Sequence, residues 1–207
     1  MQRLFSTEGR IYGGMERIYQ VMLLNCLFII SCLPVVTIGA AITAAYGTAY
    51  KLVDYREGIL YKEYLHQFRL NFWPATKIWL LLIGLILGGF AIFPFMRPFL
   101  VGNRLAYYVM MIVMTALALT VLYLFPLTAR FDNTLSGTVV NAMILSLKHL
   151  PISILLFFVS IGGVLVPFYF PKLLFAWLFV GAGLVFFLNA KLILKVFAQY
   201  ENTEERS

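Results

Sequence analysis

The chain has 207 residues, of which 62% are hydrophobic and 12% charged, and its mean hydropathy is +0.89. Soluble domains contain about 45–50% apolar and about 25% charged residues, so composition excludes a water-soluble domain, whose interior has no room for this much apolar surface. The net charge of +7 does not indicate nucleic-acid binding, because the basic residues flank apolar runs, where they meet the anionic inner leaflet. We therefore expect an integral membrane protein with lipid, and no nucleic acid, as a partner.

The first apolar run covers residues 18–33 and is followed by a stretch of small residues that ends at Leu52. Pro34 cannot continue the helical hydrogen bonding of the first run, and Gly39 lowers the cost of a turn. Two interpretations remain open: a hairpin over residues 18–54, or one kinked helix. The sequence continues without a break into a polar domain, so we expect a retained membrane segment and not a cleaved signal peptide.

The later apolar runs form two further predicted hairpins, over residues 78–128 and 152–195. A span needs roughly 17–25 residues, a length that most of these runs reach or approach. Amphipathic cytoplasmic helices are expected before them, over about residues 58–73 and 136–150. The runs themselves cover residues 78–95, 105–126, 152–170 and 173–188.

Charge placement favours six crossings with both termini in the cytoplasm of a bacterial plasma membrane. If the first run is a hairpin, the loops alternate so that Arg97, Arg104 and Lys172 lie outside, and the remaining 13 of the 16 basic residues lie inside. This asymmetry agrees with the positive-inside rule. Five crossings, with a kinked first helix, is the alternative.

An internal repeat relates the second and third hairpins. Residues 71–74 (NFWP) lead into an apolar stretch that reaches 88–89 (GG) and 93–95 (FPF), while residues 148–151 (KHLP) lead to 162–163 (GG) and 166–168 (VPF). Proline is inexpensive in the first turn of a helix, so Pro74 and Pro151 predict helix starts. The predicted fold is all-α: one transmembrane domain over residues 1–207, a polytopic bundle of about six helices in three pseudo-repeated hairpins, linked by amphipathic cytoplasmic helices.

The sequence contains no motif that indicates chemistry. Phosphate-binding, nucleophile-elbow and His-Glu metal motifs are missing, so we expect no catalytic, cofactor-binding or metal-ligating residues and no enzyme activity. Cys26 and Cys32 lie in the first apolar run, where they are interpreted as small hydrophobes. Asn25 and Asn189 are intramembrane polar residues, for which interhelical hydrogen bonding is favoured over a substrate path. Aspartate and glutamate do not occur in the apolar runs, which argues against an ion-coupled transporter.

Glycines predict close helix packing, since two glycines one turn apart let backbones approach. The candidates are Gly84, Gly88, Gly89, Gly162 and Gly163.

Two cytoplasmic segments are candidates for partner docking, or else are solvated loops. Their histidines are interpreted as interfacial polar side chains, although a proton relay or pH sensor is the functional alternative. The candidate docking residues are Arg56, His66, Arg69, Arg130, Asp132, Lys148 and His149.

Six short segments carry a resemblance to a known family. They are residues 34–37 (PVVT), 39–46 (GAAITAAY), 68–72 (FRLNF), 125–134 (FPLTARFDNT), 141–142 (NA) and 148–151 (KHLP). In them, and over nearly its whole length, the chain resembles the YesL-like family of small bacterial membrane proteins, whose function is unknown. Members of that family are typically encoded beside carbohydrate ABC importers and glycan-degrading enzymes of Gram-positive bacteria.

The resemblance implies an accessory or regulatory subunit of an oligosaccharide ABC importer, with the permease subunits as partners. The permease itself is disfavoured, because the region before Leu150-Pro151 lacks the Glu-Ala-Ala of an importer coupling helix. One alternative is a self-sufficient transporter or channel that works as a homo-oligomer. A polar cavity lined by Asn25, Tyr46, Tyr50 or Asn189 would favour it. Another alternative is a membrane assembly factor or sensor.

Overall fold

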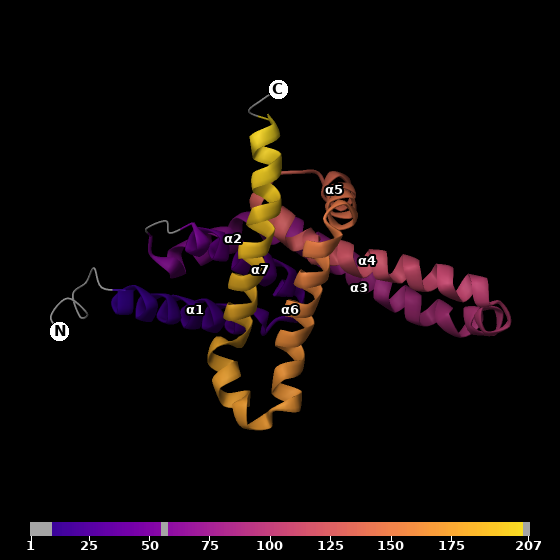
Figure 1. Cartoon of the computed structure of the whole chain (residues 1–207), viewed down its shortest axis with the longest axis horizontal. Helices are drawn as coiled ribbons and strands as arrows, with labels where there is room; N and C mark the ends of the chain where they lie inside the picture. The colour runs from indigo at the N-terminus through magenta and orange to yellow at the C-terminus, as the bar shows by residue number, and fades with distance from the viewer. Residues whose placement is uncertain (1–9, 55–57, 205–207) are drawn as a thin grey trace.

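The computed structural model describes residues 10–54 and 58–204, with side chains over residues 13–54 and 58–198. Within these ranges the protein is helical throughout and has no strand, which confirms the predicted all-α class (Figure 1). The elements are α1 (Arg10–Cys32), η2 (Val35–Thr37), α2 (Ile38–Val53), α3 (Leu60–Gly102), α4 (Arg104–Arg130), α5 (Leu135–Lys148), α6 (Leu150–Tyr169), η3 (Pro171–Leu173) and α7 (Leu174–Glu204).

Five helices of the described part are long and apolar enough to cross a membrane, in agreement with a multi-pass helical protein. They lie at Gly13–Cys32, Leu60–Gly102, Arg104–Arg130, Leu150–Tyr169 and Pro171–Ala198. Helix α2 has 16 residues and is not one of the five, but η2 leads directly into it, so that the helical stretch over residues 35–53 reaches the roughly 17 residues that a span needs.

The break between α1 and α2 answers the question that the sequence left open, because the chain forms two helices there and not one kinked helix. Pro34 has an extended backbone (φ −78°, ψ 122°), which ends α1. The Thr37 hydroxyl donates to the carbonyls of Ser31 and Pro34, at 2.7 and 2.8 Å, and holds the turn together. The end of α2 therefore returns toward the start of α1 (Figure 1).

Helix α2 occupies the centre of the fold, where it contacts α1, α3, α4 and α7. Its small side chains permit this crowding: Ala40, Ala44 and Ala45 are fully buried. A Cβ on Gly39 would lie 2.6 Å from both the Ala75 carbonyl oxygen and the Trp79 Cβ, so only glycine fits at this contact with α3.

Helix α3 has 43 residues and contains Pro74, Pro94 and Pro98. At 1.5 Å per residue it is about 65 Å long, roughly twice the thickness of the hydrocarbon core. The segment expected as a separate helix over residues 58–73 is instead the first part of α3, because the helix continues through Pro74 with the loss of one backbone hydrogen bond. At Pro151 the chain does break, since α5 ends at Lys148 and α6 begins at Leu150.

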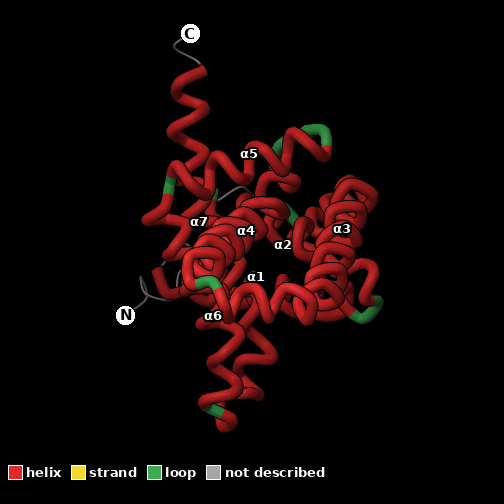
Figure 2. Tube along the Cα trace, turned by 90° about the vertical axis from the view of Figure 1, so that its right-hand side faces the viewer, coloured by secondary structure: helices red, strands yellow, loops and turns green. Residues whose placement is uncertain are grey.

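Two antiparallel hairpins, α3–α4 and α6–α7, extend from the centre in different directions (Figure 1). Figure 2 shows the α6–α7 tip pointing away from the region where α2, α3 and α4 gather. The hydrophobic core lies where α2 meets the second half of α4 and the second half of α7, with Tyr123, Ile193 and Phe197 almost completely buried. The outer parts of both hairpins are exposed.

Candidate functional site

A cavity of about 630 Å³ opens between the beginning of α1, the end of α2 and the beginning of α3. Its volume lies within the roughly 300–1,000 Å³ of small-molecule sites. The side chains around it are mostly polar or charged. They belong to Gly13, Glu16, Arg17, Gln20, Thr48, Lys51, Leu52, Gly58, Ile59, Leu60, Lys62, Glu63 and His66.

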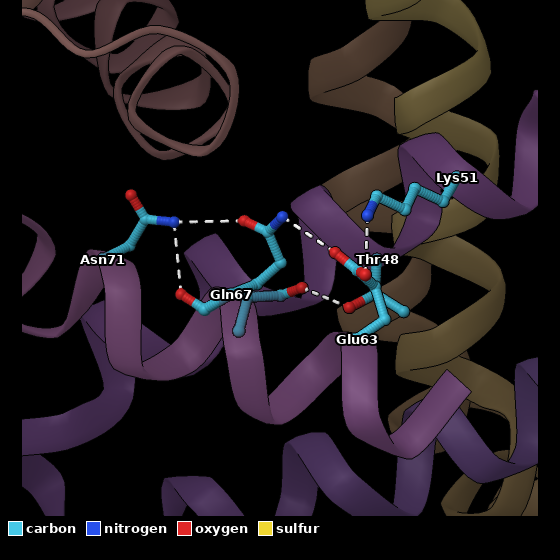
Figure 3. Close-up of polar contacts among 6 residues, drawn as sticks. Thr48, Lys51, Glu63, Gln67 and Asn71 are labelled. Atoms are coloured by element: carbon cyan, nitrogen blue, oxygen red, sulfur yellow. Dashed lines mark hydrogen bonds and ion pairs between the residues drawn. The ribbon is translucent and has the colours of Figure 1, made fainter. Parts of the chain in front are cut away.

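One wall of the cavity continues into a row of polar contacts between α2 and α3 (Figure 3). Lys51 Nζ of α2 lies 2.6 Å from Glu63 Oε2 of α3. Gln67 Nε2 donates to Glu63 Oε1 at 2.9 Å, and Asn71 Nδ2 donates to Gln67 Oε1 at 3.2 Å. The spacing of four residues places Glu63, Gln67 and Asn71 on one face of α3.

Gly47 allows this row to lie against α2. A Cβ at Gly47 would come within 2.8 Å of Gln67 Oε1. Thr48, the next residue, is buried and turns its hydroxyl back to the Ala44 carbonyl at 2.8 Å. The missing side chain at Gly47 thus leaves room for the Gln67 side chain against α2.

The Glu63 carboxyl is the most strongly held group of the row. Burial raises its pKa, but the hydrogen bonds from Lys51 and Gln67, together with the positive charges of Lys51 and His66, outweigh burial and hold the pKa below its ordinary value. Glu63 is therefore ionised at neutral pH and pairs with Lys51.

The docking residues predicted near this cavity are only partly brought together. His66 lines the cavity and is exposed, and Arg69 is exposed one turn further along α3. Arg56 lies outside the described residues.

Arg130 takes part in packing within the chain. Its guanidinium lies 5.9 Å from the centre of the Tyr50 ring and 5.6 Å from that of Phe197, and Phe131 stacks edge-on against Phe197 at 5.2 Å. Such cation–π contacts stabilise by about 0.5–1 kcal/mol each at exposed sites. Arg130 therefore ties α4 to α2 and α7.

The remaining docking candidates lie around α5. Asp132 and Lys148 are exposed, whereas His149 is partly buried at the joint between α5 and α6. The His149 carbonyl accepts from the amide of Ser153 at 3.0 Å, so its backbone starts α6. Burial, and next the neighbouring Lys148, lower the pKa of His149, so its imidazole is neutral at pH 7.

Asn25 joins α1 to α7. Its Nδ2 donates to the Leu178 carbonyl at 2.6 Å, and its Oδ1 accepts from the Gly183 amide at 3.0 Å. Asn25 is completely buried. These contacts are those of an interhelical packing residue.

Asn189 makes a similar junction between α7, α6 and α2. Its Nδ2 donates to Ser160 Oγ at 2.9 Å and to the Tyr46 hydroxyl at 3.3 Å, while its buried Oδ1 has no partner. The Tyr46 ring also packs edge-on against Phe186, with ring centres 5.1 Å apart.

The predicted packing glycines fall into two groups. A Cβ on Gly84, Gly88, Gly89 or Gly162 would meet nothing within 4 Å, so these four positions lie open on the helices. Gly163 instead faces the side chain of Val185 across the α6–α7 hairpin. Other tight helix contacts lie at Gly39 against α3 and at Gly183, where α7 meets the Val21 carbonyl of α1.

The charges of Lys51 and Glu63 are evident in the sequence, but the polar row to which they belong was not predicted. The available signal was the spacing of Glu63, Gln67 and Asn71 at intervals of four, which places polar groups on one helix face. Their meeting with Lys51 depends on how α2 lies against α3, which no local pattern reveals. In the described part of the chain, no three His, Cys, Asp or Glu side chains gather where they could hold a metal ion.

Residues 21–93 match a family described as a protein of unknown function, DUF624. This is the designation of the YesL-like family, so the resemblance is supported over these residues. The matched part contains the second half of α1, all of α2 and α3 up to Phe93, and with them the polar row. No curated protein and no solved structure matches the chain.

Proposed function

We propose that this chain is an accessory membrane subunit that associates with the permease subunits of a carbohydrate ABC importer. The resemblance to the YesL-like family implies this role, and the family match over residues 21–93 supports the resemblance. We place the protein in a bacterial plasma membrane.

The single observation that carries the proposal is the uncovered surface of the two hairpins. Only 6% of the most apolar stretch of α3, and 11% of that of α6, is buried within the chain. Phe90 and Phe95 are among the large exposed side chains, and Gly84 and Gly88 lie open on the same helix. Membrane helices associate through close packing at small residues, so a helix with open glycines can receive a helix of another subunit.

Both termini belong on the cytoplasmic side in this proposal. The start of α1 and the end of α2 line the same cavity, so the chain returns to the side on which it began. The α3–α4 and α6–α7 hairpins each return as well (Figure 1). The basic residues near these ends, such as Lys51, Lys62 and Arg130, match a cytoplasmic position.

A self-sufficient transporter or channel is less well supported. The residues expected to line its pore were Asn25, Tyr46, Tyr50 and Asn189, and none of them lines the cavity. They are used for packing instead: the Tyr50 hydroxyl, for example, donates to the Pro126 carbonyl at 3.2 Å.

The test is affinity purification of the tagged, full-length chain from native membranes in mild detergent, with all co-eluting proteins identified. We expect permease and ATPase subunits at stoichiometric levels. A double variant, Gly84→Leu with Gly88→Leu, fills the open face of α3 and should reduce permease recovery several-fold. Gly102→Leu is the matched control, because Gly102 also faces open space but lies at the hairpin tip.

Isolation of the chain alone, as a homo-oligomer, would contradict the proposal and would direct attention to flux assays in proteoliposomes. An assembly factor would give a third result. Its deletion would lower importer abundance while the activity of each assembled importer stayed unchanged.

A further inference from the structure

We infer that the cavity between α1, α2 and α3 binds the phosphate group of an anionic ligand at the membrane surface. The inference rests on the residues of the cavity and is independent of the importer association. Two sources can present such a phosphate: the headgroup of an anionic phospholipid, or a soluble phosphate ester.

Basic side chains from three helices meet around the cavity. Arg17 comes from α1, Lys51 from α2, and Lys62 and His66 from α3. Arginine and lysine are the side chains that bind phosphate most strongly, through charge-assisted hydrogen bonds. Gln20 also lines the cavity, whereas the Thr48 hydroxyl, although it lines the cavity too, donates to the Ala44 carbonyl.

The acidic side chains at the cavity are engaged within the protein. Glu63 is held by Lys51 and Gln67. Glu16 accepts a hydrogen bond from Gln20 at 3.3 Å, one turn along α1. Among the side chains that line the cavity, Arg17, Lys51 and Lys62 are positively charged and Glu16 and Glu63 are negatively charged, so the lining carries a small positive excess.

The surroundings place the cavity at the level of lipid headgroups. On α3, the exposed apolar side chains of Tyr61 and Leu65 stand next to Lys62 and His66 in the chain, and Ile59 is exposed just before α3. Exposed apolar groups interleaved with basic ones are typical of helices that lie in the headgroup–acyl boundary. On α1, Met15 and Ile18 lie on either side of Arg17 in the chain in the same way and are 66% and 59% exposed.

The experiment measures lipid binding by the purified full-length chain. Native mass spectrometry would count the lipids retained with phosphatidylglycerol, which is anionic, and with phosphatidylcholine, which is zwitterionic. A Lys or Arg near an anionic surface contributes about fivefold in binding. We expect preferential retention of phosphatidylglycerol, weakened about fivefold in Lys62→Gln and further in the double variant Arg17→Gln with Lys62→Gln.

A second arm uses glycerol 3-phosphate as a soluble probe in calorimetric titration of the same proteins. Loss of lipid preference in the variants, with no glycerol 3-phosphate binding, assigns the site to a phospholipid. Binding of glycerol 3-phosphate that falls in the variants assigns it to a soluble phosphate ester.

The control is the double variant Lys172→Gln with Arg104→Gln. It removes two positive charges, as the cavity double variant does, but at the tips of the two hairpins. Lys62 is exposed, so Lys62→Gln should keep the thermal midpoint of the wild type, and a loss of binding there cannot come from unfolding. Equal lipid and phosphate binding by wild type, cavity variants and control would overturn the inference.

Discussion

Helix α2 and the outer part of α3 are both apolar, but the fold uses them in opposite ways. Eleven of the 16 residues of α2 are buried, against eight of the 43 residues of α3. The side chains explain the difference. Helix α2 is built from Ala, Gly and Thr and is surrounded by other helices, while the outer part of α3 carries Leu, Ile and Phe and faces away from the chain.

The comparison shows that hydropathy does not locate the centre of a membrane protein. Lipid tails are as apolar as leucine, so apolar surface gains little by leaving lipid for protein. What decides is how closely two backbones can approach. Small residues therefore mark the buried helix, and large apolar residues mark the surface that lipid or another subunit covers.

Adding one methyl group to each region tests the comparison, and the largest effect is expected in α2. Gly39→Ala on α2 puts a Cβ 2.6 Å from the Ala75 carbonyl oxygen and the Trp79 Cβ, so α2 and α3 must move apart. Overpacking of this kind costs about 1–3 kcal/mol. The thermal midpoint of the purified protein in detergent should fall by several degrees.

Gly84→Ala is the matched substitution in the outer part of α3. Its Cβ meets nothing, and alanine favours a helix over glycine by about 1 kcal/mol, so the midpoint should stay or rise slightly. If the two variants have equal midpoints, the contrast between α2 and α3 is wrong.

Local patterns predicted the helices well and their mutual arrangement poorly. The apolar runs, the break at Pro34 and the helix start at Pro151 follow from length and from proline's missing amide. Pro74 was expected to start a helix as Pro151 does, but α3 continues through it and the two halves of the repeat differ. The same local motif allows both outcomes. The helix with Pro74 packs against α2 and stays continuous, whereas a turn at His149 separates α5 from α6 just before Pro151.

The site was predictable only in its parts. The charges of Lys51 and Glu63 were visible in the sequence, but their contact depends on the way α2 runs along the first half of α3. Glycine spacing pointed to Gly84 and Gly88, which are open, because a motif cannot say which helix lies opposite. The contacts of Arg130 with Tyr50 and Phe197 could not be predicted, because those aromatic rings are distant in the chain.

A smaller effect is expected from Asn25, which extends the comparison to the α1–α7 contact. Asn25→Ala removes both side-chain hydrogen bonds to Leu178 and Gly183 in a buried place. Buried polar groups left without a partner cost about 1–3 kcal/mol, although interhelical hydrogen bonds in membranes average nearer 0.6 kcal/mol. We expect a midpoint between those of Gly39→Ala and wild type.

Asn141→Ala is the control for Asn25, because Asn141 is exposed on α5. The two asparagine variants should differ clearly in thermal melts followed by tryptophan fluorescence. A midpoint for Asn25→Ala equal to that of Asn141→Ala would mean that the Asn25 contacts do not hold α1 against α7.

The smallest effect is expected at the end of α2, where the buried residues end and Lys51 pairs with Glu63 of the polar row. Glu63→Gln removes the charge paired with Lys51, whose side chain is 42% exposed, so screening limits the loss to well under 1 kcal/mol. The expected pH dependence follows from the lowered pKa of Glu63. A carboxyl whose pKa is lower in the folded than in the unfolded state stabilises above its unfolded pKa of about 4.3, and that stabilisation is lost as the pH falls through the folded pKa.

Thermal midpoints of wild type and Glu63→Gln, compared at pH 7 and at successively lower pH, therefore measure what the charge of Glu63 contributes to stability. Wild type should be slightly more stable at pH 7, and the difference should be constant down to about pH 5 and then shrink below about pH 4.3. Glu16→Gln serves as the control, since Glu16 is exposed on α1 and accepts a hydrogen bond from Gln20 one turn away. If wild type instead gained stability relative to Glu63→Gln as the pH fell, the folded-state pKa of Glu63 would be raised and not lowered. That is the behaviour of a carboxyl destabilised by burial. The end of α2 would then resemble its buried centre and not the surface.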